Sequence, residues 1–212
     1  GVSSAASDVY KRQGPKIPKD KVEELMDRLN TMKEGDILFL AGSIPASMPD
    51  DIYSRIMKEL KDKGVMIVVD ATRDLLMNVL KYHPFLIKPN NHELSEIFDI
   101  MIDSKEKAVV YAKELQKKGA QNVIVSMAGE GAVFVGSDGS VFTSEAPHGV
   151  VKNSVGAGDS MVAGFLAGYL AKGDYAEAFK MGLCTGSASA FSDQLATREE
   201  VEQVRRSHIF DF

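Results

Sequence analysis

One aspartate in this sequence follows a run of very small residues, a combination that can bind and transfer a charged group. The run Asn153-Ser154-Val155-Gly156-Ala157-Gly158 leads into Asp159, where an apolar helical pattern begins. N–H groups at a helix start lack intrahelical partners and can bind an anion, and a carboxylate there can take a proton from an attacking hydroxyl. We therefore expect Gly156, Ala157, Gly158 and Asp159 to be catalytic. The alternative is that Asp159 caps the helix and the glycines allow close packing.

A second candidate is the segment Lys88-Pro89-Asn90, which precedes Glu93 by a few residues. If a helix starts here, Asn90 and Glu93 face the same way. An amide and a carboxylate so placed could hold a hydrated Mg²⁺, which uses few protein ligands. The alternative is a capping box, in which Asn90 caps the helix and Glu93 closes it.

A third candidate is the loop Ser126-Met127-Ala128-Gly129-Glu130-Gly131, which follows an apolar strand pattern and precedes a hairpin pattern. Its backbone amides could lie against the phosphate or ribose of a nucleotide. The alternative is an ordinary turn. The glycine spacing does not continue into a dinucleotide-binding fingerprint, because Phe134 stands where a third glycine would be required.

Alternating helix and strand patterns must position these loops. Short apolar runs predict strands at 37–41, 65–69, 85–87 and 123–125, and amphipathic patterns between them predict helices. This alternation favours an α/β fold with a mostly parallel sheet flanked by helices. A hairpin is expected at 132–135 and 141–143, followed by helices near 159–171, 174–190 and 197–206. Ligands of such sheets bind at the carboxyl ends of the strands, which adds the loop 42–49 to the candidates.

The composition restricts the class of protein. The chain has 212 residues, 25 basic and 30 acidic side chains, and a formal net charge of −5. This acidic balance without a basic tract argues against nucleic-acid binding, and the longest apolar run is too short to span a membrane. The single cysteine, Cys184, excludes an internal disulfide framework and fits a cytoplasmic protein.

In this order, the loops resemble the motifs of the ribokinase-like, PfkB-type carbohydrate kinases. The matching segments are Gly42-Ser43-Ile44-Pro45, Lys88-Pro89-Asn90 with Glu93, Ser126 to Gly131, and Val155 to Ser160. The resemblance extends from Gly14 to about Val204. The stretches 151–165 and 195–200 are most similar to bacterial members that phosphorylate fructose 1-phosphate.

The resemblance implies ATP-dependent phosphorylation of the 6-hydroxyl of fructose 1-phosphate, giving fructose 1,6-bisphosphate. It makes Asp159 the general base, residues 156–158 the anion hole, and Ser43 a sugar-phosphate contact, with Asp159 also contacting the substrate. Asn90 and Glu93 would organise Mg²⁺, largely through water. The implied ATP-binding residues are Lys88, Asn90, Ser126, Met127, Ala128, Gly129, Glu130, Gly131, Gly158 and Ser187. The resemblance also implies a potassium site beside the anion hole, and there this sequence departs from the family, because Gln194 stands where relatives commonly have glycine.

The ends of the resemblance define the expected domain. Residues 1–13 have no helical or strand period and are expected to be an artefactual or disordered segment, so 14–212 would form the carboxyl-terminal part of a PfkB-type kinase domain. The family portion before residue 14 supplies most sugar contacts and a lid used in dimerisation, and without it the chain is expected to be inactive alone.

Three alternatives stay open at this point. One is a kinase of the same family with another acceptor, such as tagatose 6-phosphate, another sugar or a nucleoside. Another is a non-catalytic fragment that binds a nucleotide or sugar phosphate. The last is a fragment with an exposed sheet edge that does not fold stably by itself.

Overall fold

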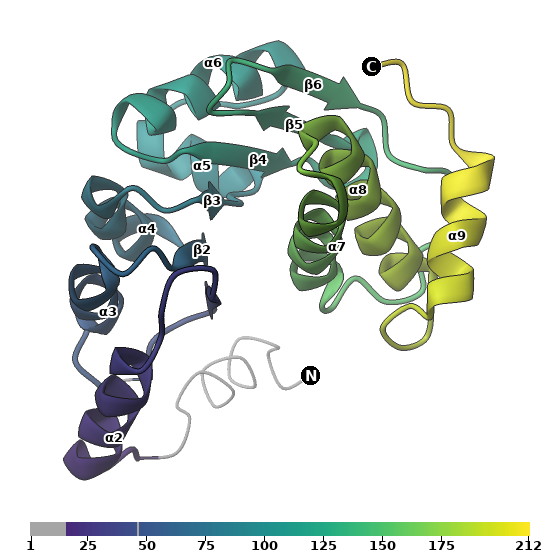
Figure 1. Ribbon diagram of the computed structural model, residues 1–212. Coiled ribbons are helices and arrows are strands. Elements are labelled where there is room, and N and C mark those ends of the chain that lie inside the picture. Colours follow the sequence, from purple (N-terminus) through teal and green to yellow (C-terminus); the bar gives the residue numbers. More distant parts are fainter. Residues whose placement is uncertain (1–15, 46) are drawn as a thin grey trace, which may run out of the picture. The chain divides into compact units, whose positions relative to one another are not determined.

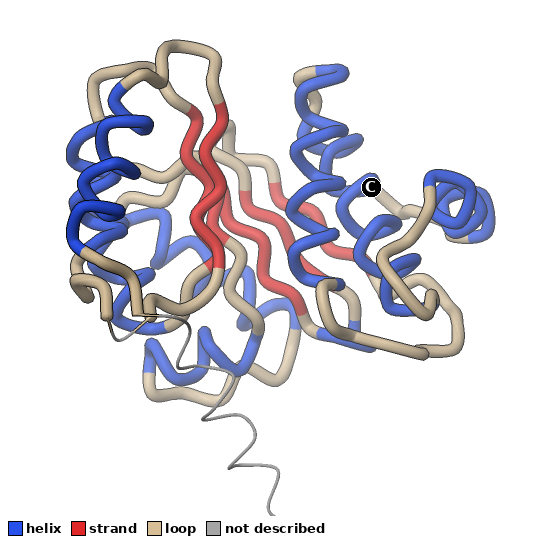
Figure 2. Tube along the Cα trace, turned by 90° about the horizontal axis from the view of Figure 1, so that it is seen from below, coloured by secondary structure: helices blue, strands red, loops and turns tan. Residues whose placement is uncertain are grey.

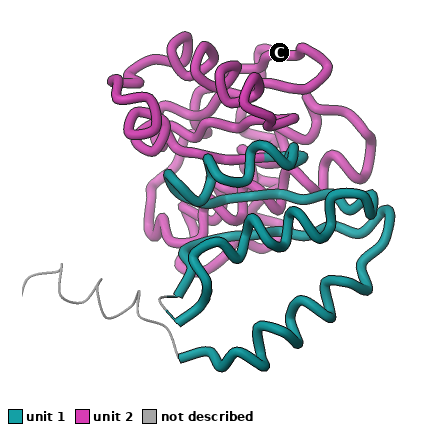
Figure 3. Tube along the Cα trace, turned by 90° about the vertical axis from the view of Figure 1, so that its left-hand side faces the viewer, with its two compact units in different colours: residues 1–86 teal, residues 87–212 magenta. Residues whose placement is uncertain are grey.

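The computed structural model describes residues 16–45 and 47–212. The expected artefactual segment 1–13 lies outside the described residues. The chain divides into two compact units, the first ending at Leu86 and the second spanning Ile87–Phe212 (Figure 3). The sequence patterns carry no signal for this division, because it falls inside a buried strand rather than in a linker.

The first unit alternates helices and strands. Its elements, labelled in Figure 1, are α2 (Lys19–Asn30), β1 (Ile37–Ala41), α3 (Ile52–Leu60), β2 (Met66–Asp70), α4 (Arg73–Val79) and the 3₁₀ turn η1 (Leu80–Tyr82). β1 and β2 are parallel, in a register that pairs Ile37 with Met66 and Ala41 with Asp70. The two strands therefore end together, and their carboxyl ends form one edge.

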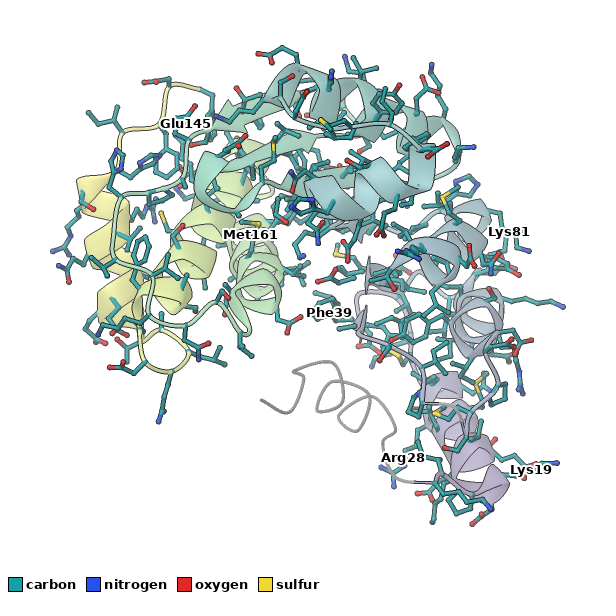
Figure 4. All side chains as sticks on the ribbon, turned by 180° about the vertical axis from the view of Figure 1, so that it is seen from behind. Lys19, Arg28, Phe39, Lys81, Glu145 and Met161 are labelled. Carbon is teal, nitrogen blue, oxygen red and sulfur yellow. The ribbon has the colours of Figure 1, made fainter. Side chains whose placement is uncertain are left out.

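The start of α3 has no side-chain cap. Asp51 occupies the N-cap position, but its side chain makes no capping hydrogen bond. Its backbone, at φ −92° and ψ 7°, lacks the extended conformation that turns a capping side chain back toward the helix. Figure 4 labels Lys19 and Arg28 on α2 and Phe39 on β1.

The second unit begins within β3 (Leu86–Ile87) and contains a mixed set of strands. Its other elements are α5 (Asn91–Phe98), α6 (Lys105–Lys117), β4 (Asn122–Ser126), η2 (Ala128–Glu130), β5 (Ala132–Val135), β6 (Val141–Ser144), α7 (Ala157–Lys172), α8 (Tyr175–Phe191) and α9 (Arg198–Ser207). The strands of this unit follow the order β3-β4-β5-β6. β4, β5 and β6 are antiparallel neighbours, which confirms the expected hairpin.

The α/β fold expected from the sequence is confirmed by this element order, and Figure 2 shows strands and helices alternating along the trace. The strands could be predicted from the sequence because each buried strand is a continuous apolar run. Val123, Ile124 and Val125 of β4, for example, have no exposed surface. In the described part of the chain, no helix is long and apolar enough to cross a membrane.

Helices α7 and α8 lie side by side in the second unit (Figure 1). Their contact needs small residues: a Cβ on Gly164 would stand 2.4 Å from Oγ1 of Thr185. Larger side chains would push the helices apart, which costs packing energy. This close packing fixes the start of α7, where the strongest candidate site lies.

Candidate functional site

The start of α7 exposes backbone donors. Its N-cap is Gly156, in the left-handed conformation at φ 81°, and no side chain caps the helix. The N–H of Ala157 donates to the carbonyl of Ser154 and that of Ser160 to the carbonyl of Gly156. Within residues 16–45 and 47–212, the N–H groups of Gly158 and Asp159 have no acceptor. The helix start therefore offers two adjacent donors to a ligand.

Asp159 is exposed and lies in the first turn of α7, three residues after the N-cap. The alternative interpretation, in which Asp159 caps the helix, is therefore wrong, because Gly156 occupies that position. The side chain can reach solvent, and the N–H of Asp159 is itself one of the two open donors. This is the arrangement that a general base next to an anion hole requires.

A buried lysine adds positive charge to the same helix start. Lys88 is only 7% exposed. A Cβ built on Gly158 would lie 3.1 Å from its Nζ and 3.5 Å from its Cε, so the ammonium rests against the glycine. Two features thus attract an anion here: the positive end of the helix dipole and the lysine charge.

Asn90 and Glu93 form the capping box that the sequence allowed. The side-chain oxygen of Asn90 accepts from the N–H of Glu93 at 2.8 Å, and a Glu93 carboxylate oxygen accepts from the N–H of Asn90 at 2.8 Å. Both side chains therefore serve α5 first. A carboxylate has about four acceptor positions, so Glu93 can bind water in addition to this bond.

The oxygen atoms of Asn90 and Glu93 can bind a metal ion only indirectly, through water molecules. Among the described residues, no three His, Cys, Asp or Glu side chains gather as a metal site. Mg²⁺ commonly keeps several waters and takes its other ligands from substrate phosphates, so it needs no such cluster.

The loop after β4 lies next to the segment before α5. The N–H of Ser126 donates to the carbonyl of Pro89 at 3.1 Å, and Ser126 forms a parallel bridge with Asn90. Beyond it, the N–H of buried Met127 donates to the carbonyl of Gly131, while Ala128, Gly129 and Glu130 are exposed. The two candidate loops are therefore neighbours, which their separation in sequence does not reveal.

Gly131 closes this loop and has no room for a side chain. Its φ is 90°, and a Cβ would lie 2.0 Å from the carbonyl oxygen of Ser144 in β6. Both the backbone conformation and the contact require glycine.

The chain entering the α7 start is tied to the end of α8. The N–H groups of Lys152 and Asn153 both donate to the carbonyl of Ala190, at 2.8 and 3.2 Å. A Cβ on Gly186 would lie 3.1 Å from the carbonyl oxygen of Ala157. The next residue, Ser187, is half-buried on α8.

A buried hydroxyl pair also joins α7 to α8, and sequence reasoning missed it. The hydroxyl of Ser189 donates to that of Ser160 at 2.9 Å and accepts from the N–H of Ala196 at 3.2 Å. The signal was the pair of serines in the run of small residues at 186–189 of α8, which had been interpreted mainly as close packing.

Ser43 belongs to the first unit, in the loop after β1. The preceding residue, Gly42, has φ 83°, and its N–H donates to the carbonyl of Asp70 at 3.0 Å. The hydroxyl of Tyr53 donates to the carbonyls of Ala41 and Gly42, at 2.8 and 3.3 Å.

The second unit thus brings three candidate segments to one place. Lys88 contacts the α7 start, and Asn90 is bridged to Ser126, so residues 88–93, 126–131 and 156–159 are linked by direct contacts. A nucleotide and phosphate site would require such a convergence, and the roles of these residues stay a prediction.

Comparisons with known proteins agree with this geometry. The family model described as "pfkB family carbohydrate kinase" matches residues 14–200. The chain is 45% identical to the 1-phosphofructokinase of Bacillus subtilis over 91% of its own length and 63% of that protein. It is 30% identical to the D-tagatose-1-phosphate kinase of Bacillus licheniformis, covering 90% of this chain and 63% of the relative.

A solved structure gives the same result. A proposed phosphofructokinase from Staphylococcus aureus superposes with a TM-score of 0.86 at 38% identity, over 92% of this chain and 63% of that one. The chain therefore spans somewhat under two thirds of the length of the relatives it matches. From the sequence match, the shared fold and the three linked segments, we conclude that this chain belongs to the PfkB family of carbohydrate kinases.

Proposed function

We propose that this chain supplies the nucleotide-binding and general-base part of an ATP-dependent kinase. Its reaction transfers the terminal phosphate of ATP to the 6-hydroxyl of fructose 1-phosphate and yields fructose 1,6-bisphosphate. The observation that carries the proposal is the α7 start: the N–H groups of Gly158 and Asp159 are open, the buried ammonium of Lys88 lies against Gly158, and the side chain of Asp159 is exposed. ATP and sugar phosphates are cytoplasmic metabolites, which is the compartment we propose.

Each group has a chemical task in this reaction. The carboxylate of Asp159 accepts the proton of the 6-hydroxyl as its oxygen bonds to the terminal phosphorus and the bond to ADP breaks. The N–H groups of Gly158 and Asp159 donate to the oxygens of the transferring phosphate, and Lys88 adds positive charge. Little covalent chemistry is required of the protein, because phosphoryl transfer depends mainly on positioning and charge stabilisation.

PfkB kinases use ATP with a divalent metal, and we propose that the metal is Mg²⁺. When bound, this ion supplies charge neutralisation on the phosphates of ATP. Both Asn90 and Glu93 are already engaged in the capping box. They would therefore hold the ion through its water ligands rather than by direct coordination. Ser126 to Gly131 and Ser187 are proposed to contact the nucleotide, and Ser43 the sugar phosphate.

Replacing the general base tests the proposal. In the full-length protein, Asp159→Asn should lower kcat by roughly 10²–10⁴ and leave the melting temperature nearly unchanged, because the side chain is exposed. Turnover is measured by coupling ADP release to NADH oxidation. Asp174→Asn is the matched control: Asp174 caps α8 through its side-chain oxygen, and asparagine caps equally well. Near-normal turnover of the Asp159 variant would remove that residue from the mechanism.

The acceptor is tested by a panel of substrates. We expect the highest kcat/KM for fructose 1-phosphate, based on the higher identity to the Bacillus subtilis 1-phosphofructokinase. Tagatose 1-phosphate belongs in the panel because a 30% identical relative is named for it. Tagatose 6-phosphate, fructose 6-phosphate and a nucleoside complete the panel. A higher kcat/KM for any other acceptor would reassign the substrate within the family.

A non-catalytic sensor of nucleotide or sugar phosphate is the competing function from another class. The exposed carboxylate beside unpaired donors favours a kinase, because a binding protein gains nothing from a negative charge next to its phosphate site. Ligand binding without ATP consumption by the full-length protein would favour the sensor.

Two finer points complete the proposal. We propose that the full-length protein is a homodimer joined through the lid that the family carries in its amino-terminal portion, which light scattering would test. Potassium dependence is tested by exchanging KCl for NaCl. Gln194 is exposed in the loop after α8. Equal activity in both salts would exclude the cation.

A further inference from the structure

A tyrosine of the first unit forms hydrogen bonds with the backbone just before Ser43. The hydroxyl of Tyr53, on α3, donates to the carbonyl of Ala41 at 2.8 Å and to that of Gly42 at 3.3 Å. From the other side, the N–H of Gly42 donates to the carbonyl of Asp70 at 3.0 Å. Gly42 is therefore held at both its N–H and its C=O.

The direction of the Gly42 carbonyl determines what Ser43 presents. The peptide group between them is planar and trans, so the N–H of Ser43 points opposite to the C=O of Gly42. Because Tyr53 holds this carbonyl, it also sets the direction of the Ser43 N–H. In the described part of the chain, neither this N–H nor the Ser43 hydroxyl has a hydrogen-bond partner. Ser43 thus offers two donors to a ligand.

We propose that Tyr53 is a positioning residue for the acceptor substrate: it orients the Gly42-Ser43 peptide so that the Ser43 N–H and hydroxyl can bind the phosphate of the sugar phosphate. This inference rests on the proposed kinase function and on Ser43 as a substrate contact. Tyr53 itself touches no reacting atom in the proposal.

Two observations support a positioning role. Burial and the nearby negative charge of Asp70 raise the pKa of Tyr53, so the phenol keeps its proton and remains a donor at physiological pH. Ala41, Gly42 and Ser43 are exposed, so water can solvate the carbonyls if the phenol is lost. Removing the hydroxyl should therefore change stability little and orientation more.

The test is Tyr53→Phe in the full-length protein. We expect the KM for the sugar phosphate to rise roughly 5- to 20-fold, while kcat and the KM for ATP change less than about twofold. Tyr82→Phe is the matched control, because it deletes the same atom in the same unit and the Tyr82 hydroxyl has no partner among the described residues. Calorimetric binding of fructose 1-phosphate should weaken by a similar factor.

A double-mutant cycle keeps the proposal falsifiable. If Tyr53 acts through Ser43, then Tyr53→Phe should have a much smaller effect on KM in a Ser43→Ala background than in the wild type. Additive effects, an unchanged KM for the sugar phosphate, or equal rises in both KM values would overturn it. If Tyr53→Phe does not fold, Gly42→Ala provides a second disturbance of the same peptide, because φ 83° disfavours alanine.

Failure of the proposed function gives a different result. A wild-type protein that consumes no ATP with any acceptor rejects the kinase proposal without the variants. Sugar-phosphate binding by calorimetry then still tests Tyr53: a Kd equal for wild type and Tyr53→Phe overturns the positioning role.

Discussion

Two helix starts in the second unit, those of α5 and α7, solve the same problem in opposite ways. At α5 the side chains of Asn90 and Glu93 close a capping box over the helix end. At α7 the N-cap is Gly156, no side chain caps the helix, and two N–H groups stay open beside Lys88. The comparison teaches that a helix start becomes a ligand site when the chain leaves its donors unsatisfied and places a compensating charge nearby.

The largest test of this contrast removes the positive charge of Lys88 at the start of α7, and we expect it to act on kcat. Lys88→Met in the full-length protein should lower kcat roughly 10²-fold, comparable to loss of one donor to a developing negative charge. Stability should fall, because Lys88 is buried and has an interaction partner in the protein that its loss would leave unpaired. Steady-state kinetics and a thermal melt measure both. A large loss of stability with normal kcat would show that Lys88 is structural.

A smaller effect is expected from Gly158→Ala. The new Cβ would meet Nζ of Lys88 at 3.1 Å, and the flexible end of that side chain must move aside. We expect kcat/KM for ATP to fall roughly tenfold, since small displacements of catalytic groups are costly. Stability should rise by up to about 1 kcal/mol, because alanine favours a helix over glycine. A rise in melting temperature with unchanged kinetics would mean that the ammonium is not used.

Glu93→Gln tests whether α5 contributes more than a cap. Glutamine can still close a capping box, so the melting temperature should stay within about 2 °C. The carboxylate charge is lost, and the Mg²⁺ concentration that gives half-maximal activity should rise roughly tenfold. Titration with MgCl₂ at fixed ATP measures this. The same half-maximal concentration in both proteins would reduce Glu93 to a capping role.

The smallest effect is expected on stability, which is measured separately from activity because Asn90 is also proposed to hold Mg²⁺ through water. Asn90→Ala should destabilise the protein by about 1 kcal/mol by removing the cap of α5. Ser104→Ala is the control: its hydroxyl caps α6 through a longer bond of 3.3 Å to Lys107, and it should cost about 0.5 kcal/mol without affecting activity. Urea denaturation measures both. Equal costs, or lower activity in the Ser104 variant, would contradict this ranking.

Much of the fold could be predicted because local patterns coincide with burial. The strand Val123 to Val125 is apolar and fully buried, and Asp138-Gly139 marked the hairpin between β5 and β6. The α7 start could also be located, because glycines before a helical pattern are a local signal. Asp159 as a cap was excluded only when the structure showed that the helix begins two residues earlier.

What could not be predicted are contacts between distant residues. The sequence does not place Lys88 against Gly158, Ser189 against Ser160, or the Tyr53 hydroxyl against Gly42. The two residues of each pair lie in different elements, and the distance between them depends on how those elements pack. Asn90 and Glu93 show a further limit: one spacing fits both a metal site and a capping box, and only coordinates show which bonds form.

Gly131 has a practical consequence for anyone who redesigns this kinase fold. Its contact with the Ser144 carbonyl makes position 131 intolerant of any other amino acid, and Met127 is anchored in the interior. Between these anchors, Ala128, Gly129 and Glu130 face solvent. On the proposal that this loop contacts the nucleotide, a randomised library that aims to change the preferred nucleoside triphosphate should vary these three positions and keep both flanks as they are.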